Sequence, residues 1–110
     1  MSPQPPNEAL RDLASLLGDT ATREIVNLFL EDFPASIGRI SSGGPEDQLR
    51  IAHGLKNSAL HMGAEKLSRR MGELEDKLSR QGGQAAPGEL AEALAEFETF
   101  AGALREYAAA

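Results

Sequence analysis

The side chains best suited to chemistry in this sequence are its two histidines, since the chain contains no cysteine. His53 lies in a stretch whose apolar residues have helical spacing, and Leu55 marks the side of that helix that faces a core. Because successive residues of an α-helix rotate by about 100°, His53 lies about 160° from Leu55, on the outward side. A neutral imidazole is a competent nucleophile near neutral pH. The spacing therefore predicts an exposed histidine that is available as a nucleophile.

The residues around His53 on the outward side are unusual for a solvated helix face. Lys56 and Asn57 follow at i+3 and i+4 and so surround the histidine on the surface. Leu49 and Leu60 also fall on this outward half, where the core does not need them. A lone surface histidine is ordinarily a polar residue without a function, but an apolar rim of this kind is typical of a protein-docking patch.

The charge distribution favours an acidic or phosphorylated partner for the same region. Residues 50–80 contain seven basic side chains, Arg50 among them, and four acidic ones, whereas the rest of the chain contains four basic and thirteen acidic residues. The histidine-bearing hairpin is therefore locally basic in a chain of net charge −6. The overall acidity argues against binding nucleic acid or an anionic membrane. The paired carboxylates, Glu75-Asp76 among them, are interpreted as solvated.

Apolar residues at helical spacing predict five helices, and no stretch has the alternation of a strand. Asn7 is expected to cap a short first helix, and Asp19 and Thr20 to supply the capping oxygens of a second that runs to about residue 41. Further helices are expected over 45–62, 64–80 and 89–107, with Gly63 as the left-handed stop of the third. Ser58 and Ala59 are expected to be small so that helices pack closely. The prediction is an all-α fold, an antiparallel four-helix bundle with a short additional N-terminal helix.

The length of 110 residues indicates one domain, expected over residues 7–110, after a proline-rich and disordered lead over residues 1–6. No apolar run approaches the roughly 18 residues of a membrane span, and the first residues are no signal peptide, so a cytoplasmic location is expected. His53 and His61 are too far apart along one helix to share a metal ion, and no metal site is expected. No glycine-rich nucleotide loop is present, which argues against a kinase.

The string from His53 to Ala59, followed by Met62-Gly63-Ala64 and Leu67, closely resembles the signature of histidine phosphotransfer (HPt) domains. That signature reads His-x-Leu-Lys-Gly-Ser-Ala, then an apolar residue, Gly-Ala, two variable residues and Leu. Residues 29–34 also look like the family's usual stretch in the preceding helix. The resemblance extends over roughly residues 20–80, and it implies a four-helix bundle with an exposed histidine on a central helix.

By this resemblance, His53 accepts a phosphoryl group from the aspartyl phosphate of a receiver domain and passes it to another receiver. Lys56 would be the charge partner of the phosphoryl group. From their positions around His53, Leu49, Arg50 and Leu60 are expected to dock the partner. Leu28 lies off the main apolar stripe of the second helix and either contacts the first helix or extends the docking patch. The resemblance implies a bacterial carrier without autokinase activity, whose partners are receiver domains and a hybrid sensor kinase. A monomer is expected because the chain is acidic and its exposed apolar patch is modest. It implies no cofactor of its own, because Mg²⁺ belongs to the receiver.

Asn57 departs from the family signature, which has glycine there. The amide either crowds the approach of the receiver or hydrogen-bonds the imidazole or the phosphoryl oxygens, and the sequence leaves both open. Three rival interpretations remain. The chain could be a non-catalytic helical adaptor that uses the same face, a domain cut from a hybrid kinase, or an enzyme with His53 as a general base.

Overall fold

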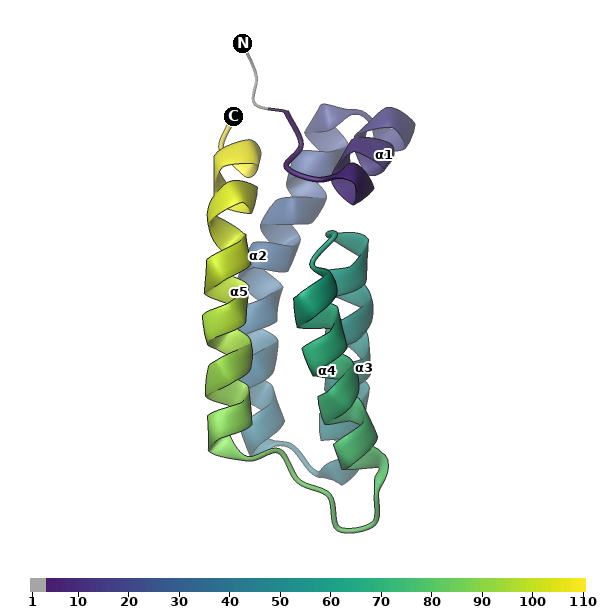
Figure 1. The fold of residues 1–110 in the computed structure, drawn as a ribbon, viewed down its shortest axis with the longest axis vertical. Coiled ribbons are helices and arrows are strands. Elements are labelled where there is room, and N and C mark those ends of the chain that lie inside the picture. Colours follow the sequence, from purple (N-terminus) through teal and green to yellow (C-terminus); the bar gives the residue numbers. More distant parts are fainter. Residues whose placement is uncertain (1–3) are drawn as a thin grey trace.

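The computed structural model describes residues 4–110, and the described residues form five α-helices without a strand. The helices are α1 (Glu8–Leu17), α2 (Asp19–Ser42), α3 (Pro45–His61), α4 (Glu65–Ser79) and α5 (Pro87–Ala108). In the bundle α2 packs against α3 and α5, and α4 packs against α3 and α5, while α1 packs against α2 beyond the end of the α3–α4 hairpin (Figure 1). The all-α fold, with four long antiparallel helices and a short additional one, is confirmed.

The core of the bundle is formed by the apolar stripes that the helical spacing predicts. The rings of Phe33 in α2 and Phe97 in α5 stack with their centroids 4.9 Å apart, and Phe29 lies 5.7 Å from each of them. Leu94 is one of the regularly spaced apolar residues of α5, and it is half-buried at the edge of this core. Burial of these apolar surfaces is the main force that holds the helices together. The core residues of α4 are Leu67, Met71, Leu74 and Leu78.

Asn7 joins the start of α1 to the end of α3. Its side-chain oxygen accepts a hydrogen bond from the N–H of Leu10 at 2.9 Å, so it caps α1 as predicted. Its amide nitrogen also donates to the carbonyl of Met62 at 2.8 Å. Gly63 follows with φ +80°, and a Cβ built there would lie 2.5 Å from the Asn7 side chain, so only glycine fits. The prediction that Gly63 stops the third helix is confirmed.

The predicted caps of α2 are wrong. The helix begins at Asp19 itself, Gly18 is the N-cap, and no side chain caps the helix. The Asp19 carboxylate instead accepts a hydrogen bond from the Tyr107 hydroxyl of α5 at 2.9 Å.

The start of α5 also differs from the prediction, since the helix begins at Pro87 rather than at Glu89. Proline is favoured in the first turn of a helix because it has no N–H to satisfy.

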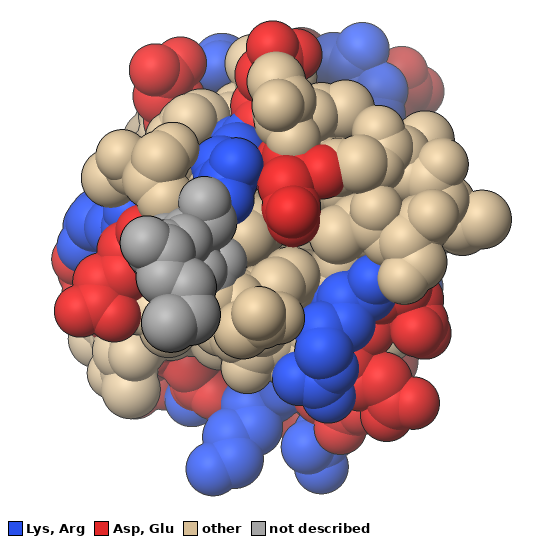
Figure 2. Space-filling model, turned by 90° about the horizontal axis from the view of Figure 1, so that it is seen from above, with Lys and Arg blue, Asp and Glu red and all other residues tan. Residues whose placement is uncertain are grey.

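The end of the bundle that carries α1 exposes two leucines, Leu16 and Leu17. Figure 2 looks down on this end, where uncharged side chains cover much of the surface and charged ones lie both near the centre and around the edge.

Of the expected disordered lead, residues 1–3 lie outside the described residues, and residues 4–6 precede α1 without helical structure. Among the described residues, none of the helices combines the length and apolarity of a membrane span.

Candidate functional site

His53 lies in α3 on the side opposite its buried residues, and its side chain is 54% exposed. The buried side of the helix carries Ala52, Leu55 and Ala59, as the rotation of 100° per residue predicts. Ala59 is fully buried, in agreement with its expected role in close packing, whereas Ser58 is half-buried. The helix therefore holds the imidazole on the surface by the burial of its other face.

A carboxylate from the neighbouring helix holds both His53 and Lys56. Glu75 of α4 accepts a hydrogen bond from His53 Nδ1 on one oxygen and from Lys56 Nζ, at 2.7 Å, on the other. Only 19% of the Glu75 side chain is exposed, so the interpretation of Glu75 as a solvated carboxylate is wrong. An ionised carboxylate only accepts hydrogen bonds, so the proton of the neutral imidazole lies on Nδ1 and the lone pair on Nε2.

The two hydrogen bonds also set the charge of Glu75. The bond from Lys56, with a smaller contribution from the bond with His53, holds the pKa of the Glu75 carboxyl below its ordinary value. Partial burial acts in the opposite direction, because it disfavours the charged form. Glu75 is therefore ionised at neutral pH, and it supplies a negative charge beside the imidazole.

The register of the α3–α4 hairpin places Glu75 opposite His53. The chain reverses at Gly63, and His53 and Glu75 lie at equal separations from Ala64. Gly72 of α4 leaves room for Lys56, since a Cβ built there would lie 3.3 Å from the lysine Cδ. Sequence reasoning missed Glu75, although the position of the turn and the lengths of the two helices contained the signal.

Asn57 lies one turn beyond His53, and its side-chain nitrogen is 3.3 Å from His53 Nε2. Because Nε2 carries the lone pair when Nδ1 donates to Glu75, the Asn57 amide is the donor of this hydrogen bond. Of the alternatives for Asn57, the structure shows the hydrogen bond to the imidazole.

The residues predicted to dock a partner are not all exposed. Leu28 is 64% exposed and Leu60 55% exposed, and Arg50 is exposed and paired with Asp47 at 2.8 Å. Leu49 is half-buried and packs against the core, so its prediction as an exposed leucine is wrong. It lies at the edge of the buried stripe of α3, where a long side chain still reaches the core.

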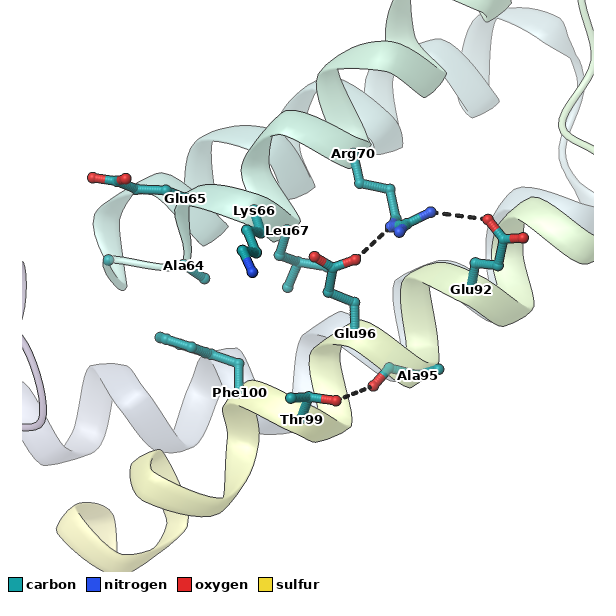
Figure 3. A pocket seen from close by; sticks show the side chains of 11 residues that line it. Ala64, Glu65, Lys66, Leu67, Arg70, Glu92, Ala95, Glu96, Thr99 and Phe100 are labelled. Carbon is teal, nitrogen blue, oxygen red and sulfur yellow. Dashed lines mark hydrogen bonds and ion pairs between the residues drawn. The ribbon is translucent and has the colours of Figure 1, made fainter.

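Surface hollows border the hairpin, and two of them lie against α2 and against α5. The smaller, of about 350 Å³, lies between α2 and α3 and includes Leu28, Ser58 and His61. The larger, of about 650 Å³, lies between α4 and α5, and His53 is not among its lining residues (Figure 3). At its edge Arg70 donates to Glu96 at 2.7 Å and to Glu92 at 2.9 Å, so these ion pairs join the two helices.

The fold is thus a helical bundle whose α3 carries an exposed histidine, His53, and a lysine, Lys56, one turn away. The family model of the Hpt domain matches residues 24–108, which covers most of this chain. The chain therefore belongs to the Hpt domain family, and the resemblance of its α3 sequence is confirmed. Members of this family take part in histidine phosphotransfer in phosphorelays, with receiver domains and histidine kinases as partners. None of the curated proteins or solved structures compared with the chain matches it.

Proposed function

We propose that His53 is the phosphoryl acceptor of this Hpt domain, and that it takes the group from the aspartyl phosphate of a receiver domain and passes it to another. The observation that carries the proposal is the hydrogen bond between His53 Nδ1 and Glu75, which leaves the lone pair on the other ring nitrogen, Nε2. The His53 side chain is 54% exposed, so a receiver can reach the imidazole ring.

In the proposed step, Nε2 attacks the phosphorus in line with the oxygen of the aspartyl group. The N–P bond forms as the P–O bond breaks, and the aspartate leaves as a carboxylate with the electron pair of that bond. The imidazole ring becomes positively charged while its proton stays on Nδ1. The charge of Glu75 stabilises the positive ring, so Glu75 is a positioning residue and an electrostatic partner.

Lys56 is proposed as the charge partner of the transferred group. Its side chain is one-third exposed and lies on the same surface as His53, where Glu75 holds the ammonium group in the free protein. A flexible lysine acts as a point charge and can turn toward phosphoryl oxygens without a fixed geometry. The partner receiver would supply Mg²⁺ and the acidic pocket, and this chain would act as a carrier that does not phosphorylate itself from ATP.

The exposed side chains of Leu28, Arg50 and Leu60 are proposed to dock receiver domains and a hybrid sensor kinase. Leu28 lines the hollow between α2 and α3, so a partner that covers this hollow would bury an apolar side chain. The proposed setting is a bacterial cytoplasm, with the chain as a monomer.

The alternative function is that of an adaptor that binds a receiver or kinase through the same face without phosphotransfer. Two observations favour it, the exposure of Leu28 and Leu60 and the contact of Asn57 with the nitrogen that would react.

The test separates the two functions by transfer of labelled phosphate. A phosphorylated receiver domain or hybrid kinase is mixed with the parent protein, with His53→Gln and with His61→Gln, which is the control for the second histidine. We expect acid-labile, base-stable label on the parent and on His61→Gln, and none on His53→Gln. A folded parent that binds these donors but takes no label would favour the adaptor.

A further inference from the structure

We propose that the Asn57 side chain is a gate over the acceptor nitrogen of His53, and that it must turn away before each phosphoryl transfer. This inference rests on the proposed function, since it takes Nε2 of His53 as the reacting atom. Asn57 stands at the position where the family signature has glycine, and the gate gives this difference a role.

The atom that Asn57 contacts is the acceptor nitrogen itself. Glu75 contacts the imidazole at Nδ1, and Asn57 contacts it at Nε2. The distance from the Asn57 side-chain nitrogen to His53 Nε2 is 3.3 Å. Glu75 fixes the proton on Nδ1, so Nε2 has one lone pair in the plane of the ring. The Asn57 amide donates its proton to this lone pair.

The single lone pair of Nε2 cannot accept a hydrogen bond and form a bond to phosphorus at the same time. The N–P bond forms from the same electron pair that accepts the hydrogen bond from Asn57. The amide must therefore leave Nε2 before phosphorus reaches it, whichever donor supplies the phosphoryl group. In the transfer that follows, the P–O bond of the aspartyl phosphate breaks and the aspartate keeps its electron pair.

The hydrogen bond that closes the gate is weak. Both Asn57 and His53 are exposed, so water replaces the lost hydrogen bond when the amide turns away. Among the described residues the Asn57 side chain makes no other hydrogen bond, and rotation about its side-chain torsions breaks only this contact. A neutral hydrogen bond at an exposed site has a small net free energy, so the gate slows reaction at Nε2 by about two- to five-fold.

A small reagent tests the gate without a receiver, so crowding by a partner plays no part. Diethyl pyrocarbonate acylates neutral imidazole nitrogens, and in a His61→Gln background His53 is the one histidine left. The rate of carbethoxylation is measured at pH 8, where an ordinary histidine is neutral. The proteins compared are the His61→Gln parent and the same protein with Asn57→Gly or Asn57→Leu.

The two Asn57 variants separate a hydrogen bond from bulk. Leucine has the same branched arrangement of heavy atoms as asparagine, is somewhat larger and has no donor, whereas glycine removes both the donor and the bulk. We expect both variants to react about two- to five-fold faster than the parent. Equal rates in all three proteins would overturn the gate, and so would a faster reaction in the glycine variant alone, because bulk would then be the barrier.

A spectroscopic measurement on the same proteins gives an independent readout. The ¹⁵N resonance of His53 Nε2 is expected to move when Asn57 is replaced by leucine, with Nδ1 still protonated. An unchanged resonance would mean that no hydrogen bond exists in solution and would overturn the proposal. Because neither measurement uses a relay partner, a failure of the gate and a failure of phosphotransfer are distinguishable.

Discussion

Replacement of Glu75 by glutamine tests the electrostatic role of this carboxylate. Glutamine has nearly the same shape, and its amide oxygen can still accept the proton of His53 Nδ1. The substitution removes the negative charge that faces the imidazole and, at 2.7 Å, the Lys56 ammonium. The variant therefore keeps the hydrogen bond to the ring and removes the stabilisation of the positive charge that develops on the ring during transfer.

The size of the effect follows from the exposure of the groups. A hydrogen bond to a charged group contributes about 1.5–3 kcal/mol, and two charges 4 Å apart interact by about 1 kcal/mol in bulk water. The Glu75 side chain is 19% exposed but that of His53 is 54% exposed, so water screens the interaction between them. The contribution of the charge therefore lies toward the lower of these values. A loss of about 1–2 kcal/mol of transition-state stabilisation corresponds to about five- to thirty-fold in rate.

The assay is the single-turnover rate of transfer from a phosphorylated receiver to the carrier, with Asp76→Asn as the matched control. Asp76 is the next residue of α4 and is exposed, so its variant removes the same charge from outside the site. We expect Glu75→Gln to slow the transfer and Asp76→Asn to leave it within about two-fold. Equal rates for the two variants would refute the electrostatic role of Glu75.

Three further predictions concern stability. Asn7→Ala removes the cap of α1 and the bond to the end of α3, so urea denaturation is expected to show a loss of about 1–2 kcal/mol. The exposed Asn27→Ala in α2 is the control, and an equal effect there would contradict the role of the cap. Phe97→Ala empties the centre of the core and is expected to cost about 3–5 kcal/mol, whereas a cost below about 1 kcal/mol would contradict the observed packing. The bond from Lys56 lowers the pKa of Glu75, so this carboxylate stabilises the fold above its ordinary pKa of 4.5 and ceases to do so as the pH falls through its lower folded pKa. The difference in unfolding free energy between the parent and Glu75→Gln should therefore shrink in acid, and a difference that grows there would have the wrong sign.

The fold could be predicted from the sequence because each helix buries an apolar stripe. The spacing of Phe29, Phe33 and Ile37 along α2 is enough to place one face of that helix in a core. The outward position of His53 follows in the same way, since the rotation between His53 and Leu55 depends on one helix alone.

The features that the sequence-based prediction missed depend on contacts between helices, which the angles between residues of one helix do not give. The contact of Glu75 with His53 requires the register of the α3–α4 hairpin, which the turn at Gly63 fixes. The capping preference of Asp19 is a local tendency, and the hydroxyl of Tyr107 from the far end of the chain overrides it. Leu49 was misplaced because the buried stripe of α3 is wider than the helical angle alone indicates.

The most direct test of the account is to locate the phosphoryl group after transfer. The carrier is labelled with ¹⁵N in its histidines and phosphorylated by a phosphorylated receiver, and the coupling between ¹⁵N and ³¹P is then measured. The account predicts one N–P coupling, to Nε2 of His53, with the proton still on Nδ1. A coupling to Nδ1 of His53, or to either nitrogen of His61, would contradict it.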